Sequence, residues 1–273
     1  MDERPIGVFD SGMGGLTVLH ECLVTLPHED FLYLGDAARL PYGPRPLAEI
    51  RRFTREIAGF LERQGVKLVV AACNSATAAA LPDLQRMLSV PIVGVLAPEA
   101  HAAVLATRNR RVGLLATEAT VASGRYADLV GALDAGVDIV QIACPRLVPL
   151  IEGPDPFGDG TAGAVREYAA PLKEAGVDTV ILGCTHYPLI RPIFQRVFGR
   201  GVTLVFSADE TAREVAETLA RKGIENSESR EGAYRFLTTG DPALFREMGR
   251  RFLQLPIAAA EHVDVATLEA AAA

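Results

Sequence analysis

Two short stretches of the sequence end an apolar run in a cysteine that is followed at once by polar side chains. One reads VVAACNS at residues 69–75, and the other reads VILGCTHYP at residues 180–188. Continuous apolar runs are typical of strands buried on both faces of a parallel sheet. Ligands bind such sheets at the carboxyl ends of the strands. We therefore predict that the two cysteines, Cys73 and Cys184, lie at a functional site rather than in the core.

Two thiols on opposite sides of a substrate can carry out a specific reaction at carbon. One thiolate removes a proton while the other thiol delivers a proton to the opposite face, and the stereocentre is inverted. Each thiol then needs a neighbour that tunes its proton affinity. His186 follows Cys184 closely and is predicted to activate it. Asp10, at the end of the first apolar run, is predicted to serve Cys73.

Short polar side chains gather around these positions. The loop DSGMGG at residues 10–15 could cradle a phosphate, but it matches neither G-x-G-x-x-G nor the P-loop pattern, and a carboxylate would suit it equally. Other short polar groups could hold the ammonium and carboxylates of an amino acid. These candidates are Asn74, Ser75, Thr117, Thr185 and the loop Pro41-Tyr42-Gly43. Glu152, placed in a predicted loop over residues 152–160, has no strong signal of its own.

The elements that must position these residues alternate between strand and helix. Strands are predicted near residues 6–9, 31–34, 68–72, 91–96, 111–116, 137–144, 179–183, 202–206 and 234–237. Helical spacing is predicted between most of them, including one helix near residues 120–133. This alternation indicates an α/β fold built on mainly parallel sheets.

Part of the pattern occurs twice. GVKLVVAAC at residues 65–73 aligns without a gap with GVDTVILGC at residues 176–184, and IGVFDS at residues 6–11 parallels VGLLAT at residues 112–117. We therefore expect two similar α/β domains that face each other, with the site at their interface. The expected division is residues 1–97 plus 208–273 for the first domain and residues 98–207 for the second.

Composition excludes several classes. The 273 residues are 49% hydrophobic and 22% charged, as in globular proteins, and the net charge of −7 argues against nucleic-acid binding. No apolar run reaches the roughly 18 residues that span a bilayer, and no signal-peptide pattern is visible, so a cytoplasmic protein with free thiols is expected. Cys22 and Cys144 are interpreted as buried apolar residues. None of the three lysines resembles a Schiff-base lysine.

Several motifs together resemble the glutamate racemase family. They are IGVFDSGMGGLTVL (6–19), LGDAARLPYG (34–43), AACNSATAAAL (71–81), LVPLIEG (147–153) and LGCTHYPLI (182–190), and they span nearly the whole chain. The resemblance implies two facing α/β domains, homodimers, and interconversion of L- and D-glutamate without a cofactor or metal, supplying D-glutamate for peptidoglycan. It implies Cys73 and Cys184 as the two acid/base residues.

The resemblance also implies roles for the residues around the thiols. Asp10 would assist Cys73, and His186 would assist Cys184 with Glu152 near the second thiol. Substrate contacts carry over by motif to Asp10, Ser11, Tyr42, Gly43, Asn74, Ser75, Thr117, Thr185 and His186.

Three positions depart from the family pattern. Ser75 stands where threonine is usual, Phe206 stands at an acid position, and Glu99 lies where a proline-glycine turn is usual. Four alternatives stay open from the sequence. They are a racemase for aspartate or a hydantoin, a hydrolase using a Cys184–His186 dyad, a metal protein, and a non-enzymatic binder of acidic amino acids.

Overall fold

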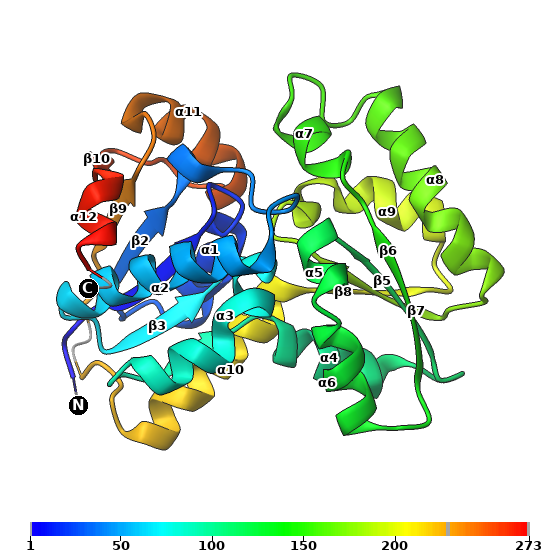
Figure 1. Ribbon diagram of the computed structural model, residues 1–273, viewed down its shortest axis with the longest axis horizontal. Helices are drawn as coiled ribbons and strands as arrows, with labels where there is room; N and C mark the ends of the chain where they lie inside the picture. Colours follow the sequence, from blue (N-terminus) through cyan, green and yellow to red (C-terminus); the bar gives the residue numbers. More distant parts are fainter. Residues whose placement is uncertain (1, 228–229, 272–273) are drawn as a thin grey trace.

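The chain forms two lobes, each a parallel β-sheet flanked by helices (Figure 1). The structure is a computed structural model and describes residues 2–227 and 230–271. The first sheet has the strand order β10-β9-β2-β1-β3-β4, and the second has the order β6-β5-β7-β8. All pairings between described strands are parallel. The predicted α/β class with two parallel sheets is confirmed.

The first lobe is built from both ends of the chain, drawn in blue to cyan and in orange to red in Figure 1. Its strands are β1 (Ile6–Asp10), β2 (Phe31–Gly35), β3 (Leu68–Ala71), β4 (Ile92–Gly94), β9 (Tyr234–Thr238) and β10 (Glu261–His262). Its helices are α1 (Leu16–Thr25), η1 (Ala37–Arg39), α2 (Leu47–Arg63), α3 (Asn74–Met87), α10 (Ser207–Lys222), α11 (Pro242–Leu253) and α12 (Val265–Glu269). One apolar cluster joins the sheet to α2, α3 and α12, and another joins its opposite face to α1, α10 and α11.

The second lobe uses the middle of the chain, drawn mainly in green. Its strands are β5 (Arg111–Ala116), β6 (Asp138–Ala143), β7 (Thr179–Gly183) and β8 (Thr203–Phe206). Its helices are α4 (Leu96–Ala106), α5 (Glu118–Ala122), α6 (Arg125–Leu133), α7 (Leu147–Glu152), α8 (Asp159–Glu174), η2 (Tyr187–Ile190) and α9 (Arg191–Phe198). Helix α4 contacts β7, β8 and α6, and it also meets α10 of the first lobe.

The two sheets share one strand arrangement. The order β2-β1-β3-β4 in the first sheet corresponds to β6-β5-β7-β8 in the second. The aligned glycines Gly65 and Gly176 have positive φ angles of 78° and 67°, each between the end of a helix and a cysteine-bearing strand. Glycine adopts this left-handed backbone without a Cβ penalty, which suits a helix end. The predicted similarity of the halves therefore extends from sequence to topology and turn geometry.

Some local expectations were wrong. The helix expected near residues 120–133 is two helices, α5 and α6, because Gly124 has a φ of 68° and interrupts the helical hydrogen bonding. Glu152 is the last residue of α7 rather than a loop residue, so the apolar residues of that stretch are helical. Helices α4 and α12 and the short strand β10 carried too weak a periodicity to be predicted.

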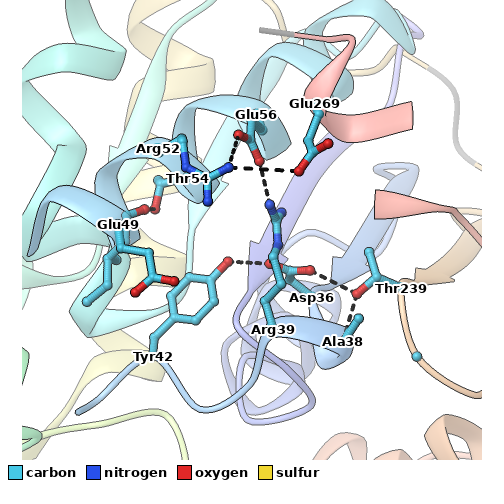
Figure 2. A network of polar contacts seen from close by, with 12 residues as sticks. Asp36, Ala38, Arg39, Tyr42, Glu49, Arg52, Thr54, Glu56, Thr239 and Glu269 are labelled. Carbon is cyan, nitrogen blue, oxygen red and sulfur yellow. Dashed lines mark hydrogen bonds and ion pairs between the residues drawn. The ribbon is translucent and has the colours of Figure 1, made fainter. Parts of the chain in front are cut away.

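A buried polar network supports the loop that follows β2 (Figure 2). The Asp36 carboxylate accepts hydrogen bonds from the Tyr42 hydroxyl, from Arg39 Nε at 2.7 Å and from Thr239 Oγ1 at 2.8 Å. Arg39 also pairs with Glu56 on α2. Because a buried charge is costly unless it is paired, these contacts fix the loop that presents Tyr42.

Candidate active site

A cavity of about 250 Å³ lies where the carboxyl ends of both sheets meet. Residues that follow β1 and β3 of the first sheet and β5 and β7 of the second contribute to its wall. The predicted site residues that line it are Ser11, Tyr42, Gly43, Cys73, Asn74, Ser75, Thr117, Cys184, Thr185 and His186. Asp10 and Glu152 lie behind this wall rather than in it. The strand-end rule therefore brings together residues from distant parts of the chain.

Cys73 is the N-cap residue of α3 and enters the cavity from the first lobe. Its side chain is 5% exposed, and its Sγ donates a hydrogen bond to Ser11 Oγ at 3.6 Å. Burial raises the pKa of this thiol to about 12, and the nearby Asp10 charge adds to the rise. Hydrogen bonds to the Ala76 backbone and to Ser11 oppose it. In the unliganded protein Cys73 is therefore a thiol near neutral pH.

Cys184 follows β7 directly and enters the cavity from the second lobe. Its Sγ lies 3.8 Å from Nδ1 of His186, and His186 Nε2 lies 2.9 Å from Glu152 Oε1. Burial lowers the pKa of His186, but its bonds to Cys184 and Glu152 outweigh burial and raise it to about 10. The arrangement is a thiol, an imidazole and a carboxylate in a row.

Asp10 is fully buried at the end of β1, and burial raises the pKa of its carboxyl. Its oxygens accept hydrogen bonds from the Gly12 N–H at 2.9 Å and from Thr185 Oγ1 at 3.3 Å. The side chain bonded to Cys73 is Ser11, so Asp10 acts on Cys73 through its charge rather than through that contact. Its bond to Thr185 joins the two lobes beneath the cavity.

Gly14, in the loop after β1, packs directly against the imidazole of His186. A Cβ built at this position would lie 2.4 Å from Thr185 Oγ1, 2.5 Å from His186 Nδ1 and 2.6 Å from His186 Cε1. Phe252 also packs against the ring in an edge-on arrangement, with the ring centroids 5.3 Å apart. The glycine at this position therefore provides room for the side chains of His186 and Thr185.

The free energy of unfolding is expected to fall as pH rises from about 6.5 to about 10 because of His186. The folded protein holds this proton more tightly than the unfolded chain, so the stabilisation is complete below pH 6.5 and is lost as pH passes 10. The slope is at most about 1.4 kcal/mol per pH unit. Urea unfolding at about pH 7 and about pH 9 should show a smaller loss in His186→Asn than in the unmodified protein. Equal losses in both proteins would contradict the raised pKa.

Hydroxyl groups connect the lobes at another side of the cavity. Ser75 Oγ lies 2.8 Å from Thr117 Oγ1, which lies 2.9 Å from Thr120 Oγ1. The Gly43 carbonyl accepts a hydrogen bond from the Ala119 N–H at 2.8 Å. Ser75, which stands where threonine is usual, thus keeps its hydroxyl in the cavity wall.

Sequence reasoning missed part of the site. Cys144 lines the cavity although it was interpreted as a core residue, and it is only 1% exposed. It follows β6 directly, so the same strand-end rule could have found it. Pro41, in the predicted loop, also lines the cavity, and the other unpredicted lining residues are Leu40, Pro44, Glu118, Pro145, Val148 and Pro149. Among residues 2–227 and 230–271, no group of three or more histidine, cysteine or acidic side chains is arranged to hold a metal.

Comparison with known proteins identifies the family. The Asp/Glu/Hydantoin racemase profile matches residues 17–215. The chain belongs to the Asp/Glu/Hydantoin racemase family. It is 51% identical to a glutamate racemase of Parafrankia sp. over 93% of this chain and 92% of that protein. A racemase is an isomerase, and this class of enzyme fits a cavity with a thiol from each lobe.

Solved structures of this racemase family share the fold. The glutamate racemase isoform RacE1 from Bacillus anthracis has a TM-score of 0.93 at 38% identity, covering 97% of this chain and 99% of that one. The glutamate racemase from Francisella tularensis, solved with D-glutamate, has a TM-score of 0.91 at 32% identity, covering 97% and 98%. Within the described part of this racemase, no helix is long and apolar enough to cross a membrane.

Proposed function

We propose that this chain is a cofactor-independent glutamate racemase that moves protons between Cα of glutamate and the thiols of Cys73 and Cys184. The observation that carries this proposal is the shared cavity, which receives one cysteine from the matched strand end of each lobe. The relatives quoted above are glutamate racemases along almost their whole length, and the Francisella enzyme was solved with D-glutamate.

The reaction conserves protons. One cysteine, as thiolate, forms an S–H bond with the Cα proton, and the electron pair of the broken C–H bond stays on the substrate. The other cysteine, as thiol, gives its proton to the opposite face of Cα and becomes a thiolate. The product has the opposite configuration, the two thiols have exchanged protonation states, and the reverse reaction resets them.

The residues around each thiol support this exchange differently. The raised pKa of Cys73 favours its acid form before substrate binds. Cys184 lies beside an imidazole whose pKa, raised to about 10, keeps the imidazole cationic near neutral pH. In the proposed first turnover Cys73 is therefore the acid, and Cys184, beside this cation, takes the role of base. Asp10 acts on Cys73, and Glu152 acts on His186, each from outside the cavity wall.

A pyridoxal-type mechanism lacks the lysine that it requires in this cavity. None of Lys67, Lys173 and Lys222 lines it, and Lys67 is buried in an ion pair with Glu29 at 2.6 Å. The carbanion-like charge must therefore be stabilised by fixed N–H groups and helix termini in a water-poor site. Helix α3, whose N-cap is Cys73, begins at the cavity and can supply backbone N–H groups and the positive end of a helix.

The wider role follows the family. We infer that the enzyme is cytoplasmic, forms a homodimer and supplies D-glutamate for peptidoglycan. The division into residues 1–97 plus 208–273 and residues 98–207 also belongs to this proposal, as does substrate contact by the lining residues. An aspartate or hydantoin substrate is not favoured, because the relatives that match the chain over most of its length are glutamate racemases.

The test is incubation of L-glutamate in D2O with EDTA-treated protein, followed by NMR and circular dichroism. We expect loss of optical activity together with deuterium at Cα, and a much lower rate with L-aspartate. An enzyme that racemises aspartate faster than glutamate would overturn the substrate assignment. Binding without exchange, or trapping of an acyl group on Cys184, would instead support a binding protein or a hydrolase.

A further inference from the structure

A buried carboxyl group stands directly behind the cavity residue Asn74. Glu99, in the first turn of α4, is 0% exposed. Its Oε2 accepts a hydrogen bond from Asn74 Nδ2 at 2.9 Å and another from the Tyr126 hydroxyl. Asn74 Nδ2 also donates to the Tyr126 hydroxyl at 3.0 Å. Asn74, Glu99 and Tyr126, here called the Glu99 triad, therefore bond to one another pairwise.

The Glu99 triad crosses from one lobe to the other. Asn74 is the first residue of α3 and lines the cavity, whereas Tyr126 lies on α6 in the second lobe. Glu99 lies on α4, which begins shortly after β4, an edge strand of the first sheet. Asn74 is 2% exposed and Tyr126 is 0% exposed, so water does not replace these bonds. The triad thus fixes a cavity side chain against the opposite lobe.

The bonds of the triad determine which way the Asn74 amide faces. An amide nitrogen has two hydrogens and no acceptor site, and both hydrogens have partners in the triad. The amide oxygen Oδ1 is buried and has no hydrogen-bond partner among the described residues. Turning the amide over would place that oxygen against Oε2 of Glu99, which already serves as an acceptor. The amide is therefore held with its oxygen unused.

We propose that Glu99 is a positioning residue that locks the Asn74 amide so that its oxygen is available to an N–H donor of the substrate. This inference rests on the proposed function, because glutamate carries such a donor in its α-ammonium group.

The hydrogen bonds that Glu99 accepts show which substitution would keep them. Burial raises the pKa of its carboxyl well above the usual range, although the bonds from Tyr126 and Asn74 oppose this and the Glu210 charge adds to it. Oε2 accepts both of these hydrogen bonds, and Oε1 has no partner among the described residues. A glutamine carbonyl can accept the same two bonds, whereas alanine accepts none.

The experiment compares Glu99→Ala with Glu99→Gln. We expect Glu99→Ala to raise the KM for L-glutamate about tenfold while kcat changes less than about threefold, and Glu99→Gln to keep both within about twofold. The same substitutions in a Cys73→Ala/Cys184→Ala background, which cannot turn over, should change the calorimetric Kd for glutamate in parallel. Glu29→Gln is the matched control, because it removes a buried carboxyl paired with Lys67 away from the cavity and should alter Tm without altering KM.

Hydrogen exchange of the Asn74 side-chain amide, followed by NMR, tests the lock without any activity. Exchange should be faster in Glu99→Ala than in Glu99→Gln or the unmodified protein. An unchanged KM, Kd and exchange rate in Glu99→Ala would overturn the positioning role while leaving the racemase intact. A parent protein that neither binds nor racemises glutamate would overturn the proposed function, and the role of Glu99 toward glutamate with it.

Discussion

Replacing either Cys73 or Cys184 by alanine is expected to lower kcat for glutamate racemisation by about 10³-fold or more. In the proposed mechanism each thiol serves one face of Cα, and alanine can neither accept nor deliver a proton. Removing the first thiol leaves the second with no partner for inversion, so the double variant should be little worse than either single one. Circular dichroism of L-glutamate and of D-glutamate, each with both single variants and the double variant, measures the effect.

Cys22→Ala is the control for these thiol substitutions. Cys22 is a fully buried cysteine on α1 that does not line the cavity, and its variant should keep kcat within about twofold even if Tm falls. A thermal melt of every variant separates lost chemistry from lost folding. Substantial racemisation by a folded Cys73→Ala or Cys184→Ala protein would end the two-thiol mechanism.

Gly14→Ala is expected to lower kcat about 10²-fold. The new Cβ would lie 2.4 Å from Thr185 Oγ1 and 2.5 Å from His186 Nδ1, whereas unbonded atoms approach to about 3.5 Å, so these side chains and the loop must separate by about 1 Å. The ring cannot yield freely because Glu152 holds Nε2 and Phe252 packs against it. A catalytic group misplaced by about 1 Å loses about 10²-fold in rate. Steady-state kinetics on both enantiomers measure this loss.

Gly131→Ala is the matched substitution for Gly14→Ala. Gly131 lies within α6, and a Cβ added there would have no neighbour within 4 Å outside the backbone of its own helix. Alanine favours helix over glycine, so this variant should keep full activity and gain up to about 1 kcal/mol in stability. If Gly14→Ala retained more than half of the normal kcat, the position of His186 would not depend on this glycine.

Much of the site was predictable because parallel sheets impose a simple rule. Apolar runs identified the strands, and chemistry-bearing residues just after them had to meet at one sheet edge. Cys73 and Cys184 follow this rule, and so do Ser11 and Thr117. The cavity joins them because the repeat places two such edges opposite each other.

The remaining contacts could not be predicted because they depend on packing between distant helices. Glu99 resembles a solvated helix acid in sequence, and only the packing of α4 against α6 and α3 makes it a buried partner of Asn74. Glu152 has no local signal, since its partner His186 comes from another segment. The break at Gly124 depends on a backbone angle that glycine permits but does not require.

The shared strand order of the two sheets has a consequence for the symmetry of the cavity. Matching strand ends bring one cysteine to the cavity from each sheet, but the side chains around the two thiols differ. One thiol has Ser11 beside it, and the other has His186 and Glu152. A nearly symmetric backbone framework thus presents two chemically different thiols to one cavity.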